Sequence, residues 1–150
     1  MSQINTTIFP LNKLGRELVI SILKTAEFLQ YKLAVQIKKE GLTLPAYNVL
    51  LVLQKSERGL PTLEIGKRID AYAPGITRLI DGLEKKKLVQ RIRLEVDRRV
   101  VLCRITTLGL QCLKILKPQI ELMEKSCVSN LTNEQCHRII ALLSHIQTPS

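Results

Sequence analysis

Apolar residues recur along the chain with two different periods, and the change of period separates helices from a hairpin. From Leu11 to about Glu40 the apolar positions lie three or four residues apart, which is typical of a helix with a wide apolar face. The same period predicts helices at about 44–55, 62–69, 74–87, 106–128 and 132–146. Residues 88–94 and 99–105 instead alternate polar with apolar side chains and are rich in β-branched residues, which predicts two strands joined by a loop at 95–98.

Threonines stand at the starts of several predicted helices. Thr43, Thr62 and Thr106 each precede or open a helical segment, where a hydroxyl accepts a hydrogen bond from an N–H of the first turn. Thr132 and Gln135 have the spacing of a capping box at the start of the last helix. These residues set the expected boundaries of the elements.

The order of the elements predicts a mostly α fold with a small β-hairpin wing, in the α+β class. Three helices followed by a two-stranded ribbon make a winged helix-turn-helix, which we place at residues 41–106 as the DNA-binding domain. Helical segments at 1–40 and 107–150 flank it and have apolar stripes wider than one chain needs to cover. We therefore expect the flanking segments to form a dimerisation layer in a homodimer.

The net charge of the chain indicates which class of partner it binds. The 150 residues include 23 Lys and Arg against 13 Asp and Glu, a net charge of +10 at pH 7. Residues 62–104 hold 11 of these cations and 6 of the anions, so half of the excess lies in the predicted winged segment. A basic surface on this fold favours double-stranded DNA as the partner. A protein-interaction module that reuses the winged fold is the alternative, since fold alone does not fix function.

Several other classes lack support in the sequence. It has no Gly-rich phosphate loop, no nucleophile elbow and no paired carboxylates in an apolar setting, so we expect neither an enzyme nor a cofactor. Cys103, Cys112, Cys127 and Cys136 form no metal-type pair, so we expect free thiols and no metal. The chain has no secretory leader pattern and no apolar run of about 18 residues, so we expect a cytoplasmic protein without membrane contact.

Two places in the winged segment have side chains suited to DNA. The helix at 74–87 opens with small and polar residues, which suit a helix that enters the major groove: Pro74, Gly75, Thr77 and Arg78. The hairpin offers arginines for the minor groove and the phosphates, with one aspartate to orient them: Arg91, Arg93, Asp97, Arg98 and Arg99. Each of these residues taken alone is also compatible with an ordinary solvated surface, and their grouping carries the prediction.

The same segments resemble the MarR family of transcriptional regulators. The resemblance rests on LTLPAYNVL at 42–50, PTLEI at 61–65, ITRLIDGLE at 76–84, DRR at 97–99 and IT at 105–106, at this mutual spacing. It implies a homodimeric regulator, with repression the expected role, that binds a palindromic operator. It further implies major-groove contacts by Thr77 and Arg78, a wing oriented by Asp97, a minor-groove contact by Arg99 and a phosphate contact by Arg98. Lys87 departs from the family pattern, which often has glycine there.

Members of this family often respond to a small ligand, which leads us to expect a small anionic or aromatic effector. The resemblance places its cleft between the dimerisation layer and the winged domain, where Tyr31, Lys32 and Tyr47 are candidate ligand-binding residues. The alternative for both tyrosines is a core position with a satisfied hydroxyl. The sequence leaves this choice open.

Overall fold

The computed structural model describes residues 13–69, 73–94, 97 and 99–147, and it divides the chain into two compact units. The first unit, Met1–Lys32, contains most of the first helix, α1 (Lys13–Lys38). The second unit, Leu33–Ser150, contains the end of α1 and every other element. Each unit is considered by itself below.

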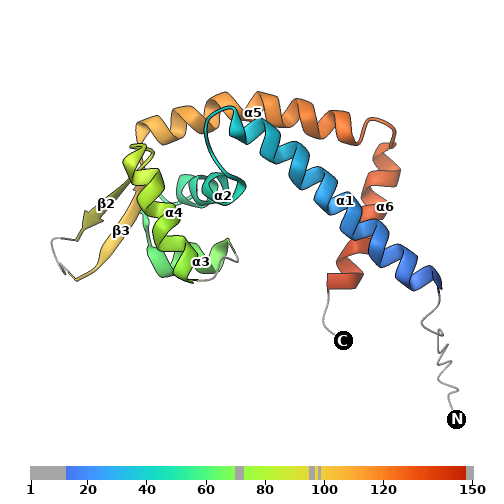
Figure 1. The fold of residues 1–150 in the computed structure, drawn as a ribbon, viewed down its shortest axis with the longest axis horizontal. Coiled ribbons are helices and arrows are strands. Elements are labelled where there is room, and N and C mark those ends of the chain that lie inside the picture. Colours follow the sequence, from blue (N-terminus) through green and yellow to red (C-terminus); the bar gives the residue numbers. More distant parts are fainter. Residues whose placement is uncertain (1–12, 70–72, 95–96, 98, 148–150) are drawn as a thin grey trace, which may run out of the picture. The chain divides into compact units, whose positions relative to one another are not determined.

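The second unit combines helices with one small sheet (Figure 1). Its elements follow in the order α2 (Leu44–Gln54), β1 (Leu60–Pro61), α3 (Thr62–Arg68), α4 (Ala73–Lys85), β2 (Val89–Arg93), β3 (Val101–Ile105), α5 (Thr107–Cys127) and α6 (Asn133–Gln147). This order confirms the predicted mostly α fold with a hairpin wing, and it places α2, α3 and α4 directly before the wing.

The sheet has a third strand that the apolar pattern did not reveal. Its strands are antiparallel in the order β1-β3-β2, with Leu60 opposite Cys103 and Pro61 opposite Leu102. A two-residue strand has no period to detect, and Pro61 fits only because β1 is an edge strand, where its missing N–H costs no ladder bond. The predicted two-stranded ribbon is therefore corrected to a three-stranded sheet.

Most of the expected helix caps are present, and one is not. The hydroxyls of Thr43 and Thr106 accept hydrogen bonds from the N–H groups of Ala46 and Gly109, at 3.4 and 3.1 Å. Thr62 is the exception, because the chain passes from β1 directly into α3. The N-cap position is thus Pro61, which has no side-chain bond to offer.

The capping box before the last helix is confirmed. The Thr132 hydroxyl accepts a hydrogen bond from the Gln135 N–H at 3.2 Å, and the Gln135 side-chain oxygen accepts one from the Thr132 N–H at 2.8 Å. These two reciprocal bonds satisfy N–H groups at the start of α6 that no helical carbonyl can reach.

The core of the winged region is aliphatic and fixes the position of α4. One face of α4 is buried against α2, α3 and the sheet. The core residues there are at most 2% exposed: Val49, Leu50, Leu53, Ile65, Ile76, Ile80, Leu83, Val89 and Cys103. Close packing of this kind gives each side chain one position. The opposite face of α4 is consequently presented to solvent in a fixed orientation.

Candidate nucleic-acid interface

The first two turns of α4 expose the residues predicted to read DNA. Ile76 and Ile80 point into the core, and the 100° step of the helix therefore turns Gly75, Thr77 and Arg78 outward. A Cβ atom built at Gly75 would meet no atom within 4 Å, so the backbone is open on this side. The turn thus offers a hydroxyl, a guanidinium and an unobstructed backbone on one exposed surface.

The wing presents Arg99 far into solvent while fixing its backbone. The Arg99 side chain is 95% exposed. Its N–H donates to the Asp97 carboxylate at 3.0 Å, and its Nε lies 3.7 Å from the same oxygen. The Val100 N–H donates to the Asp97 carbonyl, which closes the turn behind the arginine. Asp97 and Arg99 are therefore brought together, as the sequence predicted.

Arg91 occupies a different environment from the other predicted contacts. Its guanidinium lies between two carboxylates of α4, 2.6 Å from Asp81 and 2.5 Å from Glu84, and its side chain is 27% exposed. Burial lowers the pKa of the guanidinium, but the hydrogen bonds and charges of Asp81 and Glu84 outweigh it and raise the pKa overall. Arg91 thus joins β2 to α4 within the chain, and contact with DNA stays a prediction for it.

The two carboxylates around Arg91 were not found from the sequence. Asp81 and Glu84 are three residues apart on α4, a spacing that places them on one face of the helix. That spacing next to a basic strand was the available signal. The ion pairs couple α4 to β2, the first strand of the wing.

The remaining predicted contacts are Arg93, Pro74 and Arg98. Arg93 is exposed at the end of β2. Pro74 lies in the first turn of α4, but its side chain, like the whole of Arg98, is outside the described residues.

Lys87 adopts a backbone conformation that lysine rarely takes. Its φ is +58°, in the left-handed region, and its N–H donates to the Glu84 carbonyl at 2.8 Å. The Leu88 N–H donates to the Leu83 carbonyl at 3.0 Å, which completes a Schellman motif after α4. Glycine is the usual residue at this position because it has no Cβ. Lys87, where the sequence departs from the family pattern, therefore has a strained backbone conformation.

A pocket between α2 and α5 is the candidate effector site. It has a volume of about 510 Å³ and is lined by Tyr47, Leu51, Gln54, Leu110, Leu113, Lys114 and Lys117. Burial, and then the negative charge of Glu124, raises the pKa of Tyr47, so its hydroxyl stays protonated at neutral pH. Of the three predicted ligand-binding residues, the structure places only Tyr47 at this pocket.

The other two candidates belong to the first unit. Tyr31 is 66% exposed, so it is not a core residue within the first unit. The Lys32 ammonium lies 5.4 Å from the centre of the Phe28 ring, a cation–π contact along α1. Neither residue shows a ligand-binding arrangement of its own in the described helix.

The described residues offer neither a cluster of metal ligands nor a helix suited to crossing a membrane. Within residues 13–69, 73–94, 97 and 99–147, no three His, Cys, Asp or Glu side chains gather as metal ligands. Among the helices of that same described part, none combines the length and the apolar character that a membrane crossing requires. All four cysteines are free thiols, with Cys103 and Cys112 buried.

Comparison with known proteins agrees with this geometry. The model of the MarR family matches residues 42–101, from just before α2 to the first residue of β3. The HTH-type transcriptional regulator MhqR of Bacillus subtilis (strain 168) is 30% identical over 111 residues, which are 73% of this chain and 75% of that protein.

Solved structures share the fold. AbsC, a MarR family transcriptional regulator from Streptomyces coelicolor, superimposes with a TM-score of 0.80 at 21% identity, over 91% of this chain and 94% of AbsC. MepR of S. aureus, in a complex with DNA, gives a TM-score of 0.74 at 22% identity, over 87% of this chain and 95% of MepR. At these identities the likeness concerns the fold, a winged helix flanked by long helices.

Proposed function

Because the chain belongs to the MarR family of DNA-binding transcriptional regulators, we propose that it is a cytoplasmic repressor that binds a palindromic operator as a homodimer. Each copy places α4 in the major groove and its wing in the adjacent minor groove. The observation that carries this proposal is the joint exposure of Thr77 and Arg78 on α4 and of Arg99 on the wing. A repressor of this kind excludes polymerase when its operator overlaps a promoter.

The chemistry of α4 supports the major groove. A guanidinium such as that of Arg78 can donate two hydrogen bonds to the O6 and N7 atoms of one guanine. Thr77 can contact a phosphate or a base edge, and Gly75 lets the backbone approach the DNA closely. The buried side chains Ile76 and Ile80 fix the backbone of this turn, so these groups stay on one exposed surface.

The wing supports the minor groove. A narrow minor groove has an enhanced negative potential that attracts an inserted arginine. Arg99 suits this role because its side chain is extended into solvent while Asp97 restrains its backbone. The ion pairs of Arg91 fix the base of the wing relative to α4, so that the two contacts keep their spacing.

The apolar surface of the flanking helices supports the homodimer, whose dimerisation layer would consist of residues 1–40 and 107–150. Among the described residues of α6, none is buried. Large apolar side chains are left in solvent on α5 and α6: Ile115, Leu122, Ile139, Ile140, Leu142 and Ile146. A second copy related by a twofold axis would cover them and would present two recognition helices to the two halves of a palindrome.

The pocket between α2 and α5 supports a small anionic or aromatic effector. Leu110 and Leu113 supply an apolar wall, Tyr47 a phenol, and Lys114 and Lys117 two cations. An aromatic acid could therefore pack its ring on the leucines and pair its carboxylate with a lysine. Such a ligand would bind between a helix of the winged domain and a helix of the dimerisation layer.

Salt dependence of DNA binding tests the proposal. We expect fluorescence anisotropy with random duplex DNA to show affinity that falls steeply with salt, with a log–log slope of about −0.9 for each neutralised phosphate. The oligomeric state is measured in the same sample by light scattering. A monomer would contradict the homodimer. A protein that does not bind duplex even at low salt would contradict the DNA-binding role and favour a protein-interaction module.

The role of the wing is tested with Arg99→Ala. Loss of the minor-groove contact should weaken operator binding at least about tenfold, the equivalent of 1.4 kcal/mol, while the dimer and its melting temperature stay unchanged. Lys125→Ala is the matched control, because it removes one exposed cation from the last turn of α5, remote from the wing in the sequence. Equal effects of the two substitutions would show that Arg99 contributes only net charge.

A further inference from the structure

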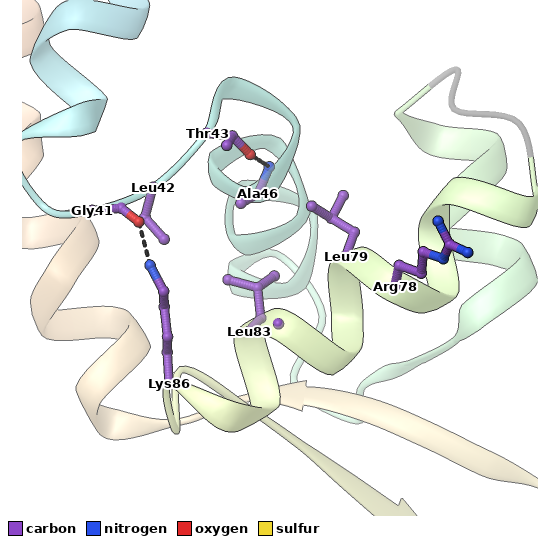
Figure 2. Close-up of a pocket in the computed structure, with 9 residues that line it drawn as sticks. Gly41, Leu42, Thr43, Ala46, Arg78, Leu79, Leu83 and Lys86 are labelled. Carbon is purple, nitrogen blue, oxygen red and sulfur yellow. Dashed lines mark hydrogen bonds between the residues drawn. The ribbon is translucent and has the colours of Figure 1, made fainter.

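Lys86, which directly follows α4, is bound within the chain although it belongs to a run of three lysines. Its ammonium donates to the carbonyl of Gly41, 45 residues earlier, in the turn between α1 and α2 (Figure 2). The Gly41 N–H donates to the Lys38 carbonyl at 2.9 Å, and the Leu42 N–H donates to the Ile37 carbonyl at 3.4 Å. These two bonds form a Schellman motif, with Gly41 at a φ of +67°. The Lys86 ammonium therefore also lies at the negative end of the α1 dipole.

The Lys86–Gly41 bond crosses a gap in the packing beside α4. A pocket of about 180 Å³ lies there, with Leu79 and Leu83 on the α4 side and Ala46 on the α2 side (Figure 2). Gly82 lines the same pocket, and a Cβ atom built there would meet no atom within 4 Å. Apolar packing is therefore incomplete on this side of α4, and the Lys86–Gly41 bond connects the two sides of the gap.

The helical spacing explains why Lys86 makes this bond and Lys85 does not. Leu79, Leu83 and Lys86 are separated by four and then three residues, which places them on one face of the helix. The Lys86 N–H still donates to the Gly82 carbonyl at 3.2 Å, so helical geometry extends to this residue. Lys85 is turned by about 100° from Lys86 and does not line the pocket.

The charge of Lys86 also acts on α5. Burial raises the pKa of the Cys112 thiol on α5, the negative charge of Glu40 raises it further, and the positive charge of Lys86 lowers it. Such effects weaken with distance. Lys86 therefore lies near the point where α4, the end of α1 and α5 meet.

We propose that Lys86 is a positioning residue that sets the orientation of α4 by binding the Gly41 carbonyl, and that it does not contact DNA itself. The inference rests on the proposed function, in which α4 enters the major groove and residues 1–40 belong to the dimerisation layer. The Lys86–Gly41 bond then restrains α4 relative to the residues that end this segment. Base contacts by Thr77 and Arg78 require a defined helix orientation, whereas phosphate contacts carry no sequence information, so the bond contributes to specificity.

The positioning role is tested by fluorescence anisotropy over a range of salt concentrations, with random duplex and with an operator selected from a pool of random duplexes. Lys86→Met keeps the length of the side chain but has no donor. It should weaken operator binding about three- to tenfold, the worth of one hydrogen bond, while the slope of affinity against salt stays that of wild type. Lys86→Arg keeps both the donor and the charge, and it should restore the affinity for the operator.

Lys85→Met is the matched control, because it removes the same charge from a residue outside the pocket. Its affinity for random duplex should equal that of Lys86→Met, since both variants lose one cation. Its ratio of operator affinity to random-duplex affinity should stay that of wild type, whereas the ratio should fall in Lys86→Met.

The Lys86–Gly41 bond is measured without DNA from the carbonyl ¹³C signal of Gly41. A hydrogen bond to a carbonyl oxygen deshields its carbon, so this signal should move upfield in Lys86→Met and stay in place in Lys85→Met. An unchanged Gly41 signal in Lys86→Met would overturn the bond.

The remaining outcomes separate this inference from the proposed function. A wild-type protein that binds no duplex contradicts the proposed function and the positioning role with it, while the Gly41 signal alone decides the bond. If Lys86→Met weakens operator and random duplex alike and lowers the salt slope by about one, Lys86 contacts a phosphate and the positioning role is overturned. An operator affinity equal to that of Lys85→Met would overturn the positioning role as well.

Discussion

Lys87 has an unfavourable left-handed backbone conformation that glycine would adopt without strain. Its left-handed conformation ends α4 and turns the chain into β2, and a lysine side chain makes that turn unfavourable. The Thr106 hydroxyl donates to the Lys87 carbonyl at 2.7 Å while it caps α5, so the strained residue lies at a junction of two helices. The surrounding structure, and not the conformational preference of lysine, therefore determines the backbone conformation of Lys87.

Lys87→Gly should stabilise the protein. Relief of the left-handed strain favours the variant by about 1 kcal/mol, less the entropy that glycine adds to the unfolded chain. Urea denaturation followed by circular dichroism measures the change. Lys85→Gly is the control, since it removes the same charge from a helical position and should destabilise the protein by up to about 1 kcal/mol. Destabilisation of both variants would contradict the prediction that the backbone of Lys87 is strained.

At the scale of elements, two kinds of contact hold α4 and the wing at a fixed spacing. The two elements share an apolar core through Leu83 and Val89. They are also joined by a polar link, in which the Arg91 side chain bridges Asp81 and Glu84 and the Glu84 carboxylate accepts from the Arg91 N–H at 3.3 Å. The link spans the edge of β2, so it also occupies an N–H that would otherwise be open.

Arg91→Gln should weaken DNA binding more than it destabilises the fold. The ion pairs are partly exposed, so we expect a loss of only about 1 kcal/mol in unfolding free energy. Operator affinity should fall several-fold because the wing is less firmly held. A double-mutant cycle with Asp81→Asn separates the two effects: Asp81→Asn should reproduce part of the loss, and the double variant should add little to Arg91→Gln. Fully additive effects would show that Arg91 acts on DNA independently of Asp81.

At the scale of the whole molecule, the helices α5 and α6 leave large apolar side chains exposed. Leu122 on α5 is 71% exposed and Ile140 on α6 is 67% exposed. Burial of one such side chain is worth about 1.5–3 kcal/mol, so a row of them can hold two copies together. The proposed dimer also sets the spacing of the two recognition helices and thus the length of the operator.

Ile140→Glu should convert the proposed dimer to a monomer at micromolar concentration. A carboxylate among the exposed apolar side chains of α6 must be desolvated if two copies associate through them. Operator affinity should then fall at least about a hundredfold, because the two half-sites are no longer bound together. Sedimentation velocity measures the dissociation. Gln147→Glu adds the same charge at an exposed polar position of α6 and should leave the dimer intact. A dimeric Ile140→Glu protein would place the interface elsewhere.

The sequence by itself determined those features that depend on neighbouring residues. The periods of apolar residues located the helices and the wing, and the caps at Thr43, Thr106 and Thr132 followed from bonds that span three residues. The exposed turn at Thr77 and Arg78 was predictable for the same reason, since burial of Ile76 and Ile80 fixes which face of the helix is outward.

Only the tertiary structure decided the features that join residues distant in the chain. β1 exists because Leu60 pairs with Cys103, and neither residue carries a local signal for that contact. Arg91 is bound by Asp81 and Glu84 because β2 folds back along α4, so a residue predicted to contact phosphate acquired partners within the protein. Electrostatic partners depend on which charges the fold brings within a few ångströms, and local patterns do not contain that information.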